Sequence, residues 1–304
     1  MHMYDQVTAN KRRSAVLIAV FVLFVVLVGV AFSYLLQWGP VGIVIALAIA
    51  GGSAFASYWK SDSIALAMSR AHPATVEQYP RLHNLIEGLC IASGLEKPRL
   101  YIIDDPAPNA FATGRNPKHA AIAVTTGLLE KMNRIELEGV LAHELSHIKN
   151  DDILVSTLAV TMVGVVALLA DMGVRMLWFG GGRRSNDNNG GNVVTLVLAV
   201  AALVLIVLSP IIAQLMQFAV SRRRETLADM SGVEMTRYPP GLISALQKLQ
   251  ADQTVVRSAS RATAHLWIES PLARTPEEGK MSKLNRLFDT HPPLEERIAA
   301  LQEL

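Results

Sequence analysis

The segment from His143 to His147 reads HELSH, which is an H-E-x-x-H pattern. In a helix, residues four positions apart lie on one face, so both imidazoles can reach a single ion. Zinc accepts two imidazoles and a carboxylate and keeps a fourth position open for water. Glu144 can take a proton from that water and pass it to a leaving amine. The pattern predicts a hydrolytic zinc site with His143 and His147 as ligands and Glu144 as the catalytic base.

The residues around HELSH favour a helix with one buried side. They include the apolar residues Ile135, Leu137, Val140, Leu141 and Ile148. The alternative is a pair of surface histidines beside a glutamate, because a short motif can also occur by chance.

The third zinc ligand has to come from elsewhere in the chain. The metzincin pattern needs a glycine and a histidine at the positions of Asn150 and Ile153, so that class is excluded. Residues 221–229 read SRRRETLAD, in which Glu225 and Asp229 are about one helical turn apart. We expect Glu225 to complete a His-His-Glu site and Asp229 to accept a hydrogen bond from a ligand histidine.

Four apolar stretches are long enough to cross a membrane as helices. The chain is 51% hydrophobic and 18% charged, against about 25% charged in an average soluble domain. A bilayer core needs roughly 20 apolar residues in a helix. The alternatives are core helices of a soluble protein and, for the first stretch, a cleaved signal peptide. The four predicted spans are Ser14 to Leu36, Val41 to Tyr58, Ile153 to about Phe179, and Val193 to about Gln217.

The basic residues predict which side of the membrane each segment faces. They cluster before the first span, after the second and after the fourth, and the positive-inside rule then places both termini in the cytoplasm. The loop from Gly180 to Asn192 falls outside, although it carries Arg183 and Arg184. The predicted organisation, in the cell (inner) membrane, is a membrane hairpin at 1–59, a cytoplasmic catalytic part at 60–152, a second hairpin at 153–217 and a second catalytic part at 218–304.

The order of these segments brings Glu225 back to the histidines. The third and fourth spans form a hairpin, so the chain returns to the same membrane surface just after Gln217. Glu225 is the first carboxylate after that point, whereas Glu234 lies further along and is the less favoured ligand. The alternative for Glu225 is an ion pair with Arg222 or Arg223, since such exposed pairs are common.

The polar regions predict an α+β domain with a small β-sheet, so the fold class is a mainly α membrane protein. Predicted strands are Arg99 to Ile103, Asn109 to Gly114 and His119 to Thr126. Predicted helices are Val76 to Leu95, Glu136 to Asn150, Gly241 to Ala251 and Pro293 to Leu304. Residues 252–290 carry no assignment, and Cys90 is expected in the core.

The combination of these motifs resembles the HtpX-type membrane zinc metallopeptidases, relatives of the CAAX prenyl endopeptidases. It consists of a hairpin of spans, NAFATG at 109–114, HELSHIKNDD at 143–152, two more spans, ETLAD at 225–229 and THPP at 290–293. The resemblance covers essentially the whole chain. It implies a gluzincin-like catalytic domain, one Zn²⁺ per subunit, and a role in degrading damaged or misfolded membrane proteins, often under stress. The resemblance implies that His143, His147 and Glu225 are the zinc ligands and that Glu144 is the catalytic residue.

Two further residues are weaker candidates. The family's NAF segment begins at Asn109, where a short edge strand can bind substrate as an added strand; an ordinary strand with a turn asparagine is the alternative. His291 in THPP can donate a hydrogen bond to an oxyanion or simply fix the turn before the last helix.

Asp151 and Asp152 are interpreted mainly as interfacial polar residues, although a role behind a ligand histidine is possible.

The predicted function is endopeptidase action on protein or peptide substrates at a lipid bilayer. The net charge of +2 gives no reason to expect a nucleic-acid partner. The chief alternative is a catalytically silent membrane scaffold or chaperone that retains the fold, which would not need Glu144. A transporter is disfavoured because the predicted spans carry almost no polar groups.

Overall fold

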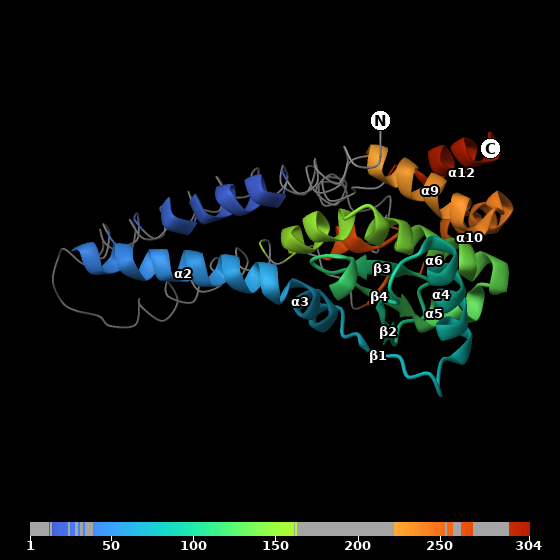
Figure 1. The fold of residues 1–304 in the computed structure, drawn as a ribbon, viewed down its shortest axis with the longest axis horizontal. Coiled ribbons are helices and arrows are strands. Elements are labelled where there is room, and N and C mark those ends of the chain that lie inside the picture. Colours follow the sequence, from blue (N-terminus) through green and yellow to red (C-terminus); the bar gives the residue numbers. More distant parts are fainter. Residues whose placement is uncertain are drawn as a thin grey trace, which may run out of the picture.

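The computed structural model describes residues 12, 14–23, 25–27, 30, 33, 39–160, 162, 222–252, 254–257, 263–269 and 292–304. These residues form a mostly helical chain around one small mixed sheet (Figure 1). Most of the third predicted span, the whole of the fourth, the loop between them and His291 lie outside the described residues.

The helices and strands follow the sequence pattern closely. The helices are α2 (Gly39–Trp59), α3 (Ser61–Met68), α4 (Pro80–Ser93), α5 (Thr126–Lys131), α6 (Arg134–Lys149), α9 (Arg222–Thr236), α10 (Pro239–Ala251) and α12 (Leu294–Gln302), with 3-10 turns η1 (Pro117–His119) and η2 (Ala264–Leu266). The strands are β1 (His72–Pro73), β2 (Arg99–Ile103), β3 (Ala110–Thr113) and β4 (Ala121–Thr125). The largest boundary difference is at the helix predicted from Val76, which starts at Pro80 because the residue before a proline disfavours the helical conformation. The strand predicted from His119 starts at Ala121, after η1.

The sheet has the strand order β1-β2-β4-β3, so β3 is an edge strand. β4 pairs in parallel with β2, with Ile102 opposite Val124, and antiparallel with β3, with Ala112 opposite Ile122. Every residue of β3 and β4 is buried. The strands predicted at 109–114 and 119–126 are therefore neighbours in the sheet, and β3 lies against α6 at one border of it.

Helix α6 is the central helix of the domain and packs against α9 and α10. It starts with a capping box, in which the Asn133 side chain accepts from Glu136 N at 3.0 Å and Glu136 Oε2 accepts from Asn133 N at 2.8 Å. Such a cap stabilises a helix by about 1 kcal/mol. Glu136 also accepts hydrogen bonds from Lys248 and Ser244 of α10, both at 2.7 Å. The start of α6 is thus fixed to a helix more than 100 residues later in the chain.

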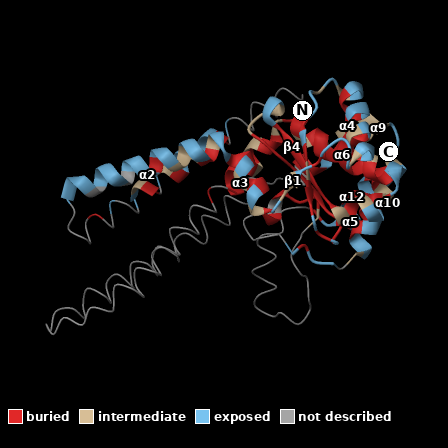
Figure 2. Cartoon of the chain, turned by 90° about the horizontal axis from the view of Figure 1, so that it is seen from below, coloured by how far each residue is buried: buried red, intermediate tan, exposed pale blue. Residues whose placement is uncertain are grey.

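Helix α2 leaves the sheet-containing domain as a long apolar helix. It has 21 residues and a mean hydropathy of 1.9, and only 6% of its most apolar window is buried. Figure 2 shows this exposure along its length. It is the one helix in the described part of the chain that is long and apolar enough to cross a membrane, and Ser14–Leu27 is a shorter apolar helix. The prediction of four spans therefore stays a prediction.

Residues 152–160, directly after α6, are also helical and begin the third predicted span. They and the first apolar helix share a separate apolar cluster formed by Leu17, Phe21, Val25, Ala50, Val155, Leu158, Ala159 and Met162. The HELSH helix therefore ends only a few residues before this apolar cluster.

Candidate metal centre

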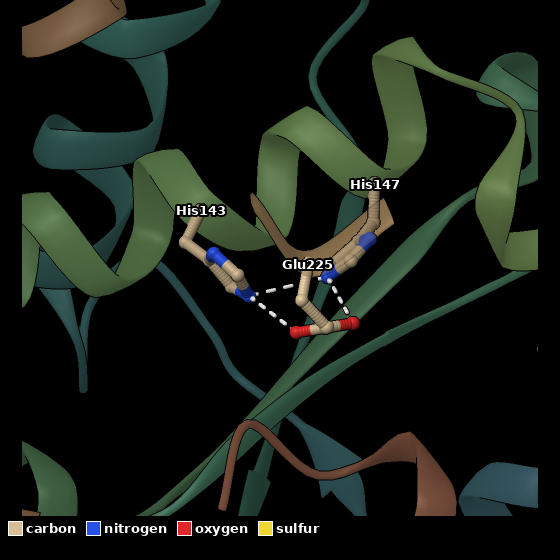
Figure 3. A group of neighbouring side chains, drawn as sticks. All are labelled: His143, His147 and Glu225. Carbon is tan, nitrogen blue, oxygen red and sulfur yellow. Dashed lines mark hydrogen bonds and ion pairs between the residues drawn. The ribbon is translucent and has the colours of Figure 1, made fainter. Parts of the chain in front are cut away.

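His143, His147 and Glu225 converge on one point, as Figure 3 shows. The two Nε2 atoms of the histidines are 3.1 Å apart. Glu225 places Oε2 3.6 Å from Nε2 of His143 and Oε1 3.7 Å from Nε2 of His147. The histidines come from α6 and the glutamate from α9, so the cluster joins segments almost 80 residues apart in the chain.

Close packing of α6 and α9 places the carboxylates of α9 beside the histidines. Gly232 of α9 lies against the backbone of α6, and a Cβ at this position would be only 3.1 Å from N of His143. Real Cβ atoms rarely have such close contacts. Glu225 and Asp229 lie on the same helix as Gly232, so they reach His143 from the side at which the two helices touch.

A carboxylate behind each histidine sets its tautomer. Nδ1 of His143 lies 2.9 Å from Oδ1 of Asp229, and Nδ1 of His147 lies 3.3 Å from Oδ2 of Asp152. Each carboxylate can accept a hydrogen bond from Nδ1–H, and the Nε2 of a neutral ring then offers its lone pair to a cation. The two Nε2 atoms, 3.1 Å apart, face the same point. Two lone pairs and a carboxylate that meet in this way form a cation site.

The charges around the cluster favour a cation as well. Burial lowers the pKa of His143 to about 4, and the Arg297 guanidinium adds to this shift. Burial also acts to lower the pKa of His147, but Glu225, Asp152 and Glu144 outweigh it and raise that pKa to about 9. The carboxylates thus create a negative potential at Nε2 of His147, which a divalent ion would neutralise.

Arg297 of α12 contacts three residues of the site. Its Nε and Nη2 donate to the two carboxylate oxygens of Asp229 at 2.9 and 2.6 Å, and Nη1 lies 4.0 Å from Oε2 of Glu225. Nη2 of Arg297 is also 3.3 Å from Nδ1 of His143. Because Nδ1 of His143 donates its own proton to Asp229, it does not accept a hydrogen bond from Arg297. Burial acts to raise the pKa of Asp229, but Arg297 and His143 lower it to about 2. Asp229 is therefore held as a charged acceptor.

The donor set fits zinc. Nitrogen and oxygen ligands lie about 2.0–2.2 Å from a zinc ion, and at the corners of a tetrahedron they are then about 3.3–3.5 Å from one another. The separations in the cluster, 3.1, 3.6 and 3.7 Å, bracket that value. The His-His-carboxylate chemistry is also that of catalytic zinc sites. Only small shifts of the side chains are needed to hold the ion.

The structure brings together most of the residues predicted from the sequence. Glu144 is 1% exposed, follows His143 on α6, and is close enough to His147 for its charge to raise the pKa of that ring. Asp229 lies behind His143, as expected. Glu234, the less favoured ligand, is exposed on α9. Asn109 contacts Thr125 and Glu269.

One residue of the site was missed in the sequence, and another matches the alternative interpretation. Asp152 is 2% exposed and lies 3.3 Å from Nδ1 of His147, in agreement with the alternative of a role behind a ligand histidine. Asp151 has a φ of 55°, so the chain turns in the left-handed region and directs Asp152 back toward the histidine. Arg297 was not predicted, because it appeared only as one charge on an amphipathic helix. Nothing in the sequence of such a helix distinguishes a buried arginine from an exposed one.

A buried H-E-x-x-H helix completed by a glutamate from a second helix defines a metal-dependent peptidase. The profile of Peptidase family M48 matches residues 77–304. The chain belongs to peptidase family M48.

Curated relatives match over nearly the whole chain. A Protease HtpX homolog of Streptococcus mutans serotype c is 46% identical over 305 residues, which covers 99% of this chain and 100% of the relative. A Protease HtpX homolog of Lactobacillus helveticus is 44% identical over 307 residues, with the same coverage. Among solved structures, the crystal structure of S. mikatae Ste24p has a TM-score of 0.42 and 21% identity, and the match covers 88% of this chain and 66% of that one. The resemblance to HtpX-type peptidases is confirmed.

Proposed function

We propose that this metallopeptidase is a zinc-dependent endopeptidase anchored in a membrane. The observation that carries the zinc assignment is the convergence of His143, His147 and Glu225 within 4.8 Å of one another. The apolar and exposed helix α2 supports the membrane anchor. Damaged or misfolded membrane proteins are the proposed substrates, since a site so close to an apolar cluster can meet chains at the bilayer surface.

Each residue of the site has a proposed role in hydrolysis. His143, His147 and Glu225 would hold Zn²⁺, which would supply Lewis-acid chemistry at the site. Glu144 takes a proton from the attacking water and delivers it to the leaving amine nitrogen. Asp229 and Asp152 accept hydrogen bonds from Nδ1–H of the two ligand histidines and so hold the rings in place.

Metal removal tests this function directly. The full chain, purified in detergent, should cleave a casein-type substrate, lose the activity in a zinc chelator and regain it with added Zn²⁺ but not with Mg²⁺, which prefers oxygen ligands. Cleavage that persists after complete zinc removal would contradict the proposal. Binding of unfolded chains without any cleavage would instead favour the scaffold or chaperone alternative.

We also propose four spans, with both termini and the metal centre in the cytoplasm. The basic residues that flank the apolar segments support this orientation. The proposed boundaries between the membrane hairpins and the cytoplasmic parts, at residues 59, 152 and 217, follow from this orientation. α2 supplies the second of the four spans, and residues 152–160 the start of the third.

Cysteine labelling in intact cells tests the orientation. Single cysteines at Glu77, Asn188 and Glu303 are exposed to a membrane-impermeant thiol reagent, and only the one at Asn188 should react. The native Cys90 is buried and gives little background. Glu77 and Glu303 are exposed, so their protection would come from the membrane and not from the fold. All three should react after permeabilisation. Labelling at Glu77 in intact cells would show that the orientation is reversed.

A further inference from the structure

The side chain of Asn109 is engaged inside the protein. Its Nδ2 donates to the carbonyl of Glu269 at 3.0 Å, and its Oδ1 accepts from N of Ala110 at 3.0 Å. Asn109 is only 3% exposed. The amide of Asn109 therefore links Ala110 of β3 to the backbone at Glu269.

The segment that Asn109 holds lies along the open border of β3. Ile268 donates its N–H to the carbonyl of Ala110 at 3.0 Å, as a neighbouring strand would. The ring of Trp267 packs edge-on against Phe111, with ring centroids 4.9 Å apart. Both Trp267 and Ile268 are fully buried. The apolar residues of this segment, Leu266–Glu269, are therefore part of the core.

The same segment continues to the metal centre through Arg297. Nη1 of Arg297 donates to the carbonyl of Ile268 at 3.2 Å, while Nε and Nη2 bind Asp229. Asp229 in turn contacts Nδ1 of His143 at 2.9 Å. Arg297 is 3% exposed, so water does not screen these contacts. The direction of the guanidinium is fixed at one end by Ile268 and at the other by Asp229.

We propose that Asn109 is a positioning residue for the metal centre. It fastens Leu266–Glu269 to β3, this segment orients Arg297, and Arg297 holds Asp229 against His143. Residues that orient a metal ligand commonly change metal affinity by about 10–100-fold when they are replaced. The inference rests on the proposed zinc site and adds a connection between the edge strand and a ligand.

Zinc affinity and the spectrum of a substituted metal test this role. Asn109→Ala should weaken zinc binding by about tenfold, the lower end of the range for residues behind a ligand, as measured by competition with a chelator. It should also shift the visible absorption of the Co²⁺-substituted protein, because the His143 ring turns. The matched control is Asn116→Ala. Asn116 caps η1 in the loop between β3 and β4, and its replacement should change neither quantity.

A role in substrate binding gives the opposite result. Asn109→Ala would then raise KM for peptides while zinc affinity and the Co²⁺ spectrum stay as in the native chain, and this outcome would overturn the proposal. If the wild-type chain binds no zinc at all, the proposed function fails instead, so the two failures are distinguishable.

Arg297→Lys tests the same connection from its other end. Lysine keeps the positive charge but cannot bind Asp229 through two nitrogens and Ile268 through a third. It should produce a Co²⁺ spectral change in the same direction, even if Asn109→Ala does not fold. When both variants fold, the double variant should bind zinc about as weakly as the weaker single variant, because both break one network. Fully additive losses, or an unchanged spectrum in Arg297→Lys, would refute the network.

Discussion

Replacement of Glu144 by glutamine should reduce peptide-bond hydrolysis by at least about 100-fold, which is typical for the loss of a general base. Glutamine has nearly the shape of glutamate but cannot accept a proton. Glu144 is not one of the three converging ligand residues, so the variant should retain its zinc. Activity on a casein-type substrate and zinc content by atomic emission, measured on the same preparation, check both parts.

The matched control for this experiment is Glu138→Gln. Glu138 lies on the same helix, α6, but is partly exposed and lies outside the cluster. It should keep activity close to that of the native chain. A Glu144→Gln protein that cleaves at the native rate would show that another group removes the proton.

Replacement of Glu225 by alanine should remove both metal and activity. The loss of a ligand should weaken zinc binding by more than the roughly 10–100-fold seen when residues behind a ligand are replaced. It also leaves the two Nε2 atoms of His143 and His147 with no carboxylate between them. Zinc content after dialysis against the same buffer separates this variant from Glu144→Gln, which should lose activity alone.

Glu234→Ala is the control for the third ligand. Glu234 lies on the same helix, α9, but is exposed, so its removal should leave zinc content and proteolysis unchanged. Full zinc occupancy with native affinity in Glu225→Ala would overturn the assignment of this ligand. Loss of zinc in Glu234→Ala would redirect it to that residue.

The parts of the structure that follow from local periodicity could be predicted from the sequence. The helical pattern around HELSH gave α6 to within about two residues at its start. The spacing within SRRRETLAD put Glu225 and Asp229 on one face of a helix, and the expected return of the chain to one membrane surface linked them to His143. These predictions needed only helix geometry and the cost of an unsatisfied backbone in lipid.

Contacts between distant segments could not be predicted in the same way. Arg297 meets Asp229 across 68 positions and His143 across 154, and an amphipathic pattern places a charge such as Arg297 on the solvent side. Its burial depends on partners from other helices. Residues 263–269 gave no periodic signal either, since Trp267 and Ile268 are buried by contacts with β3 and not by a regular element of their own.

The position of Arg297 on α12 also affects how the enzyme is made. The ribosome synthesises His143, His147 and Glu225 before it reaches α12, so a nascent chain contains the three proposed ligands without the residue that fixes Asp229. Until α12 docks, Asp229 lacks the guanidinium that holds it beside Nδ1 of His143. We therefore expect the complete arrangement of the site to form only after the end of the chain has been made.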